Sequence, residues 1–241
     1  MRMIATRPQL GWRLSDLAAV CDQDKATVHR MLACLVDERL VEQRESDRHY
    51  VPGPMMHELG LALPNHVQFE QRAEALVQAC ARRMGGIVLL MLRSGNEYVC
   101  SARAGTLALA GLMVYPGTRR PLFTSVGGVA ILQALPADEV HHILLDNVAQ
   151  EIKRHGSGRL DALQQMREQS DEYGFGVNLG VVVSGVHAFA VPIRNKQGAP
   201  FAALCLAGTP ELYGESALES LRESLQGTAE DIETVAQQFG I

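Results

Sequence analysis

The sequence has few cysteines, and none is paired at the spacing of a metal site. The 241 residues include five cysteines, an odd number, and no two of them form a C-x-x-C pair. Disulfide frameworks and zinc ribbons are built from closely spaced, paired cysteines, so this pattern argues against both. We therefore expect a protein of the reducing cytoplasm that holds no metal ion and needs no cofactor.

A long apolar run is also missing. The longest uncharged stretches, residues 121–137 and 177–193, are interrupted by glycine and proline and fall short of a membrane-spanning helix. The chain does not open on a basic-then-apolar leader, and it contains no internal repeat or low-complexity tract. We expect a soluble protein that has no membrane partner.

The chain has no excess of basic residues. It carries 22 lysines and arginines against 27 aspartates and glutamates, a net charge of -5. Residues 1–57 are balanced, so the whole acidic excess lies in the rest of the chain. Binding to nucleic acid without sequence preference depends on neutralised phosphates. A nucleic-acid binder of this charge is therefore expected to be selective and dimeric rather than non-specific.

Two short amphipathic helices are the clearest positive signal. Their apolar positions recur at intervals of three and four residues, first at Leu14, Leu17, Ala18 and Cys21 and then at Val28, Met31, Leu32 and Leu35. This spacing predicts two helices that each bury one face. Residues 22–24 between them are too few for a long loop, and their aspartates can cap a second helix that begins near Lys25.

A polar hairpin follows the second helix. Residues 40–43 and 49–51 are strand-like, and the polar residues 44–48 form the turn between them. This order is typical of a winged helix-turn-helix, in which the second helix enters the major groove of DNA and the wing contacts phosphates. The candidate DNA-binding residues are Lys25, Ala26, Thr27, His29 and Arg30 of the helix and Arg44 and Arg48 of the wing. An ordinary helical subdomain that binds nothing remains the alternative.

The remainder of the chain mixes helices and strands. Residues 54–67 indicate a linker helix whose Met and Leu side chains pack on a second subunit or on their own domain. We expect helices at 68–84, 128–135, 138–146, 159–173 and 216–239, and strands at 87–92, 97–101, 112–115, 186–193 and 201–206. The expected fold class is α+β, with a winged helix-turn-helix at 1–53, the linker helix at 54–67 and a domain with an antiparallel sheet at 68–241.

Several stretches, taken in order, resemble the isocitrate lyase regulator (IclR) family of bacterial transcription factors. They are LSDLA from Leu14, KATVHRMLACL from Lys25, RHYVPG from Arg48, GTRRPL from Gly117, SVGGVAIL from Ser125, YGF from Tyr173 and SGVHAFAVPI from Ser184. The resemblance runs nearly end to end and implies a C-terminal effector-binding domain of the GAF-like type. It also implies a homodimer or homotetramer on a palindromic double-stranded DNA operator, which represses or activates nearby genes when a small organic effector, often a carboxylate or aromatic, is bound.

Two features depart from the family pattern. Only residues 2–6 are available for a helix before the helix-turn-helix pair, so the first helix is expected to be short or the start of the chain late. The family commonly has acidic residues after the glycine-aromatic pair, where this chain reads GVNLGVVVSG from Gly176. The family's ligand preference therefore does not carry over directly.

A loop of small residues before an apolar helix is the candidate effector site. Ser125, Val126 and Gly127 lie at the expected helix N-terminus, where unpaired N–H groups and the positive end of the helix dipole attract an anion. A close turn that holds nothing is the alternative. The resemblance adds Leu109, Leu112, Arg120, Asn178, Ala188, Cys205 and Ala207 as effector-binding residues. The small Ala188 and Ala207 predict room for a ligand larger or more apolar than a two-carbon acid.

Other function classes are weaker. Ser184 and His187 are close in sequence, but alternation along a strand would place them on opposite faces, and no acid or G-x-S-x-G elbow completes a hydrolase triad. His141 and His142 diverge by about 100° on a helix and have no further metal ligand at the right register. We therefore expect no catalytic or metal-binding residues. A small-molecule sensor that acts through protein contacts without DNA remains a second alternative.

Overall fold

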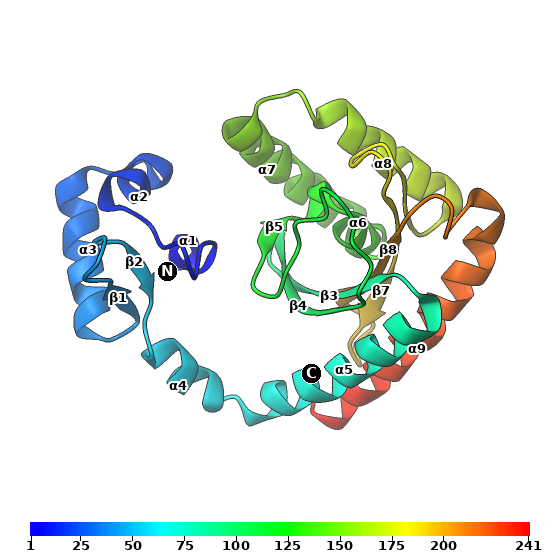
Figure 1. Ribbon diagram of the computed structural model, residues 1–241, viewed down its shortest axis with the longest axis horizontal. Helices are drawn as coiled ribbons and strands as arrows, with labels where there is room; N and C mark the ends of the chain where they lie inside the picture. Colours follow the sequence, from blue (N-terminus) through cyan, green and yellow to red (C-terminus); the bar gives the residue numbers. More distant parts are fainter. The chain divides into compact units, whose positions relative to one another are not determined.

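The chain forms two compact units. The computed structural model describes residues 1–241, apart from the side chain of Ser216. Unit 1 is Met1–Val67 and unit 2 is Gln68–Ile241, and each is described by itself. Unit 1 is mostly helical, whereas unit 2 combines one six-stranded sheet with helices on both of its faces (Figure 1).

Unit 1 contains the predicted helix pair and hairpin. Its elements are α1 (Arg2–Ala5), α2 (Leu14–Cys21), α3 (Lys25–Asp37), β1 (Val41–Gln43), β2 (Tyr50–Pro52) and α4 (Met55–Leu61). The turn between α2 and α3 is tight because Asp22 takes the left-handed conformation at φ 54° and closes α2. Asp24 then accepts the Thr27 N–H at 2.9 Å, which satisfies one of the unpaired donors at the start of α3.

A small apolar core holds these elements together. Its buried members are Ile4, Trp12, Leu17, Ala18, Val28, Leu32, Val41 and Tyr50. Two of the expected core positions are wrong, because Cys21 is exposed and Met31 is 58% exposed. The core is narrow and covers only the stripe of α3 that carries Val28 and Leu32.

The stretch expected to be one linker helix is divided. α4 ends at Leu61, and α5 (Pro64–Met84) begins three residues later. Proline has no N–H and a fixed φ, so it is tolerated in the first turn of a helix, while the residue before it is pushed out of the helical region. Pro64 therefore ends the first helix and starts the second. α4 buries none of its residues, and Met56, Leu59 and Leu61 are exposed.

Unit 2 is built on one antiparallel sheet. Its strands are β3 (Ile87–Ser94), β4 (Glu97–Ala104), β5 (Arg119–Pro121), β6 (Gly176–Leu179), β7 (His187–Arg194) and β8 (Pro200–Gly208), in the order β5-β4-β3-β8-β7-β6. Side chains alternate between the two faces of a strand. Val88 and Leu90 therefore belong to one core, and Ile87, Leu89 and Met91 to the other.

Helices cover both faces of the sheet. α5 and α9 (Leu218–Gln238) pack on the face that carries Val88 and Leu90. The other face is covered by α6 (Val126–Gln133), α7 (Ala137–His155) and α8 (Leu160–Tyr173). Two short 3-10 helices, η1 (Leu122–Thr124) and η2 (Glu215–Ala217), precede α6 and α9. The predicted α+β class is confirmed, with a winged helix-turn-helix followed by an antiparallel-sheet domain.

Two sequence expectations in unit 2 are wrong, and two of its strands were missed. Residues 112–115 have irregular backbone instead of a strand, because the turns at 110–111 and 116–117, with Gly111 at φ 83° and Gly117 at φ 85°, bend the chain on either side of them. The sequence did not predict β5 and β6, which are only three and four residues long. α7 extends to His155, well beyond residue 146. No helix among the described residues is long and apolar enough to cross a membrane.

Candidate functional site

The first turns of α3 form an exposed polar surface on unit 1. Residues 25–30 are all helical, and Val28 is the one among them that is buried. Lys25, Ala26, His29 and Arg30 are exposed, and Thr27 is half-buried. An Arg30 Nη2 donates to Thr27 Oγ1 at 3.1 Å, so the guanidinium is held along the helix surface.

The aspartate that caps α3 makes this surface sensitive to acid. Hydrogen bonds from Thr27 hold the pKa of Asp24 below its usual value. A carboxyl group whose pKa is lowered by folding stabilises the folded state above its unfolded pKa, and this contribution is lost as the pH falls through the lowered pKa. We expect Asp24→Ala to lower the melting temperature of the protein at pH 6. Below about pH 4, the melting temperature of this variant should depend less on pH than that of the wild type.

Circular dichroism melts at a series of pH values measure this effect. The matched control is Asp37→Ala, at the opposite end of α3, where a negative charge opposes the helix dipole and its removal should cost nothing. Equal losses in the two variants would contradict the capping role of Asp24.

The wing presents its two arginines differently. Arg44 donates to the carbonyl oxygens of Gln9 at 3.1 Å and Leu10 at 2.8 Å, and its Nε lies 3.3 Å from Asp47 Oδ1. Its guanidinium therefore ties the hairpin to the segment before α2. Arg48 is exposed at the turn and takes a left-handed φ of 59°. Sequence reasoning did not separate these two positions.

Unit 2 encloses a cavity on the α6 side of its sheet. The cavity measures about 90 Å³. Its floor comes from strands β3, β4, β7 and β8, and its walls come from the start of α6 and from residues 111–114 and 182–186. The lining residues from the sheet, including its outer strands β5 and β6, are Leu89, Met91, Tyr98, Arg120, Asn178, Ala188, Cys205, Leu206 and Ala207.

The structure brings most of the predicted effector residues to this cavity. Those that line it are Leu112, Arg120, Ser125, Val126, Asn178, Ala188, Cys205 and Ala207. Leu109 and Gly127 do not line it. Gly127 is packed into the wall, where a Cβ atom would lie 2.4 Å from Cys205 Sγ and 2.7 Å from Met91 Sδ. Leu109 is half-buried against the same core.

The cavity also has lining residues that sequence reasoning missed. Tyr98 and Arg159 are the polar ones with the longest side chains. The alternation of β4 places Tyr98 and Cys100 on one buried face, which is a signal that could have pointed to Tyr98. Arg159 precedes α8 and has no such signal, because its position depends on the packing of distant elements.

The start of α6 and strand β6 each contribute a polar side chain to the cavity wall. Ser125 caps α6, with its Oγ accepting the Gly128 N–H at 3.1 Å. Asn178 is buried, and its Oδ1 accepts the N–H groups of Val181 at 3.1 Å and Val182 at 3.2 Å. Asn178 thus folds the loop that forms one wall, while its amide nitrogen remains available as a donor.

Two arginines line the cavity, and one of them is paired with a buried carboxylate that lies outside it. Arg120 donates to the Met113 carbonyl at 2.7 Å, and Arg159 Nη1 lies 3.1 Å from Glu151 Oε1. Glu151 is 1% exposed, and the His155 Nδ1 contacts its second oxygen at 3.2 Å. The residues that line the cavity include no aspartate or glutamate. This charge distribution favours an anion over a neutral or cationic ligand.

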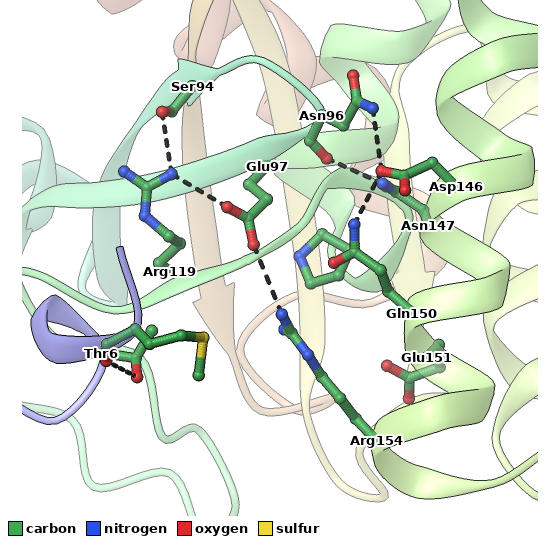
Figure 2. Close-up of polar contacts among 12 residues, drawn as sticks. Thr6, Ser94, Asn96, Glu97, Arg119, Asp146, Asn147, Gln150, Glu151 and Arg154 are labelled. Atoms are coloured by element: carbon green, nitrogen blue, oxygen red, sulfur yellow. Dashed lines mark hydrogen bonds and ion pairs between the residues drawn. The ribbon is translucent and has the colours of Figure 1, made fainter. Parts of the chain in front are cut away.

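A polar network fixes the sheet edge that carries Arg120 and Tyr98. Figure 2 shows Glu97 between Arg119, at 3.1 Å, and Arg154 of α7, at 3.8 Å. Asn96 joins the same edge to α7 through Asp146 and Asn147, each at 3.0 Å. Because these contacts join β4 to β5 and to α7, the side chains that the two strands direct to the cavity have fixed positions.

The cysteines near the cavity are unreactive. Burial raises the pKa of Cys100 to about 11 and raises the pKa of Cys205 still further. The thiolate is the reactive form of cysteine, so both remain protonated at neutral pH. Cys205 Sγ packs 3.5 Å from Met91 Sδ and serves as an apolar wall of the cavity.

Family comparisons cover nearly the whole chain. Residues 63–234 match the family model described as "Bacterial transcriptional regulator IclR C-terminal", and residues 1–45 match the IclR helix-turn-helix domain. The regulator KipR of Bacillus subtilis is 24% identical over 90% of this chain and 86% of its own length. The repressor AllR of Escherichia coli K12 is 25% identical over 92% of this chain and 82% of its own length.

Solved structures show the same fold. An IclR family transcriptional regulator from Brucella abortus aligns with a TM-score of 0.74 at 21% identity, covering 97% of this chain and 89% of that one. The Thermotoga maritima IclR aligns with a TM-score of 0.62 at 20% identity, covering 100% of this chain and 96% of that one.

Proposed function

Because the chain belongs to the IclR family of bacterial transcriptional regulators, we propose that it binds a palindromic operator as a dimer and responds to a compact organic acid. The observation that carries the effector assignment is a cavity lined by two arginines and by no acidic side chain. The proposed division of the chain is DNA binding by residues 1–53, a linker at 54–67 and effector binding by residues 68–241.

The exposed start of α3 supports the DNA contact. In a winged helix-turn-helix, these residues reach base edges in the major groove. Lys25, Thr27, His29 and Arg30 supply the polar side chains, and Ala26 lets the backbone approach a phosphate. Arg48 contacts phosphate from the wing, whereas Arg44 mainly braces the wing against the carbonyls of Gln9 and Leu10.

The exposed apolar residues of α4 support assembly with a second copy. Met56, Leu59 and Leu61 are 37%, 54% and 58% exposed on a helix that buries no side chain. Apolar patches of this kind mark protein contacts, and two-fold symmetry would place two recognition helices on two half-sites of a palindrome. A homodimer is the smallest assembly that meets this requirement, and two dimers would form a homotetramer.

The size of the cavity favours a small acid over an aromatic ligand. The cavity volume of about 90 Å³ is smaller than the apolar cavity of about 150 Å³ that accommodates a benzene ring. The prediction of a ligand larger than a two-carbon acid is therefore restricted to a short aliphatic chain. Val126, Ala188 and Ala207 would contact that chain, while Arg120, Arg159 and the N–H groups at the start of α6 bind the carboxylate.

The proposed mechanism is a population shift. Arg159 is shared between the cavity and the buried Glu151 of α7, so an effector that attracts this guanidinium alters the contacts at the end of α7. Such a ligand changes the balance between two arrangements of the dimer by its difference in affinity for them. The spacing of the two recognition helices, and hence operator affinity, changes with that balance.

Catalysis is not part of this proposal. Ser184 lies in an exposed loop, and the His187 Nδ1 is occupied by the Tyr213 carbonyl at 2.8 Å. The rings of His141 and His142 are 6.1 Å apart at an angle of 65°, and no group of three metal-binding side chains occurs in the described part of the chain. The related proteins are regulators, and we place this one in the cytoplasm with its DNA.

A thermal-shift screen followed by gel shifts tests the proposal. We expect a short-chain carboxylic acid to raise the melting temperature of the full chain, while the amide of the same acid does not. The same acid should change the affinity of the chain for DNA from upstream of its own gene. A response to amides and acids alike would contradict the anion site. A chain that binds no duplex even at low salt would instead favour the sensor that acts through protein contacts alone.

A further inference from the structure

One residue at the end of α3 has a backbone conformation that is costly for its type. Among the described residues, the non-glycine residues with positive φ are Asp22, Arg39 and Arg48, at 54°, 57° and 59°. Asp22 has a short polar side chain that tolerates the left-handed region, and Arg48 belongs to the exposed turn of the wing. Neither reason applies to Arg39, which follows the last turn of α3.

Arg39 occupies a position where helices usually have a glycine. Its N–H donates to the Val36 carbonyl at 2.9 Å, and the N–H of Leu40 donates to the Leu35 carbonyl at 2.9 Å. These two bonds end α3 in a Schellman motif, in which the residue with positive φ is usually glycine because a Cβ atom is unfavourable there. An arginine at this position costs free energy, so we looked for a role that glycine could not fill.

Both the backbone and the side chain of Arg39 hold the start of α4. Its carbonyl oxygen accepts the Met55 N–H at 3.1 Å, and its Nη2 lies 2.9 Å from Oε1 of Glu58, in the first turn of α4. Gly53 packs on the same backbone, because a Cβ atom there would lie 2.2 Å from the Arg39 carbonyl oxygen and 2.9 Å from the Val41 nitrogen. One residue therefore joins the end of α3 to the first turn of α4.

The Arg39–Glu58 ion pair suits a role in setting direction better than a role in stability. Its side chains are 58% and 47% exposed, and exposed ion pairs add little to the free energy of folding. The positive φ of Arg39 opposes even this small gain. α4 buries no side chain, so apolar packing does little to fix its direction within unit 1. The contacts with Arg39 are therefore a main determinant of the angle between α3 and α4.

We propose that Arg39 is a positioning residue that fixes the angle between α3 and α4 and thereby selects the spacing of the operator half-sites. This inference rests on the proposed function, in which α4 contacts a second copy and each copy places its α3 in one half-site. With α4 held by the second copy, a change in the angle at Arg39 moves one recognition helix relative to the other. A palindrome is bound tightly only when the separation of its half-sites matches that of the two helices.

Operators with altered spacing test the proposal. The probes are the duplex from upstream of the protein's own gene and copies of it with one or two base pairs inserted between the half-sites. Each added base pair rotates one half-site by roughly 35° relative to the other. We expect two added base pairs to raise the Kd of the wild type at least tenfold. In Arg39→Gly and in Glu58→Gln, which both lack the ion pair, this penalty should be at least threefold smaller.

Two further variants serve as controls. Asp22→Gly is the matched control for the change to glycine, because Asp22 has the same left-handed conformation at the end of a different helix. It should keep the wild-type preference for the natural spacing. The double variant Arg39→Glu with Glu58→Arg reverses the ion pair and should restore the preference that Glu58→Gln loses.

The melting temperature separates positioning from a structural role. Glycine adopts positive φ without the cost of a Cβ atom, so Arg39→Gly should melt at or above the temperature of the wild type while it loses the spacing preference. A lower melting temperature in Arg39→Gly, an unchanged spacing preference in that variant, or a reversed ion pair that does not restore the preference overturns the proposal.

The proposed function fails in a different way. If the wild type binds no duplex, the operator assignment is wrong and the role of Arg39 falls with it. If the wild type binds the natural duplex and the copies with altered spacing equally well, only the role of Arg39 is wrong.

Discussion

Gly128→Ala is expected to destabilise unit 2 by about 3 kcal/mol or more and to abolish the effector response. A Cβ atom at this position would lie 1.8 Å from the Leu122 carbonyl oxygen, 2.5 Å from its carbonyl carbon and 2.6 Å from its Cα. All three are backbone atoms, so no side-chain rotation relieves the overlap. The start of α6 would have to move away from η1, and with it the Ser125 cap that shapes the cavity.

Urea unfolding of the full chain, followed by a spectroscopic signal that arises in unit 2, measures this loss of stability. Gly227→Ala is the matched control, because Gly227 lies within α9 and no atom lies within 4 Å of its added Cβ. Alanine loses less conformational entropy than glycine in a helix, so this control should gain about 0.5 to 1 kcal/mol. A Gly128→Ala protein as stable as the wild type would show that η1 and α6 are not packed as closely as described.

The winged helix-turn-helix could be predicted because its determinants are local. Helical spacing, the capping Asp24 and the polar turn at 44–48 all lie within a few residues of the elements they specify. The limit of such reasoning appears at Arg44. Its partners are the carbonyls of Gln9 and Leu10, which are 35 and 34 residues away in the sequence. Nothing in the hairpin itself distinguishes this bracing arginine from the exposed Arg48.

The cavity could be predicted only where a helix start or a family resemblance marked it. The Ser125 loop was recognisable as a capped helix N-terminus, and the resemblance supplied Asn178, Ala188 and the β8 residues. Tyr98 and Arg159 were missed because they reach the cavity through tertiary packing, from β4 and from the start of α8.

The segment before β5 shows a second limit of prediction from the sequence. Residues 112–115 have the apolar composition of a strand, but the two flanking glycines at positive φ turn the backbone on itself, and the Leu112 N–H bonds the Leu109 carbonyl. Composition alone cannot distinguish these outcomes, because strand propensity depends on the neighbours that a segment meets. The same segment supplies Leu112, Met113 and Val114 to the cavity. This wall of the cavity is therefore a loop, where the sequence predicted a strand.

Arg30→Ala is expected to weaken operator binding about 10- to 100-fold and to leave effector affinity unchanged. Arg30 is exposed on the second turn of α3, and its bond to Thr27 Oγ1 holds the guanidinium near the surface that enters the groove. A bidentate contact to a base is worth about 1 to 3 kcal/mol of discrimination. Fluorescence anisotropy with operator and scrambled duplexes measures the affinity for each.

The reciprocal variant makes the separation of the two sites testable. Asn178→Ala removes the amide donor of the cavity and the Oδ1 that folds its wall, so effector binding should weaken while operator affinity without effector is retained. Arg167→Ala is the charge control for Arg30, because Arg167 pairs with Asp171 on α8 and lies outside both sites. If Arg30→Ala lost effector binding, or Asn178→Ala lost operator binding, the assignment of the two activities to separate units would be wrong.

The salt dependence of binding then identifies what Arg30 contacts. Loss of a phosphate contact weakens binding to every duplex equally and reduces the slope of log K against log salt by about 1. Loss of a base contact mainly reduces the preference for operator over scrambled DNA. Because the acidic excess of the chain leaves little non-specific attraction for DNA, we expect the second pattern at Arg30 and the first at Arg48. The same pattern at both arginines would contradict the proposed division between recognition helix and wing.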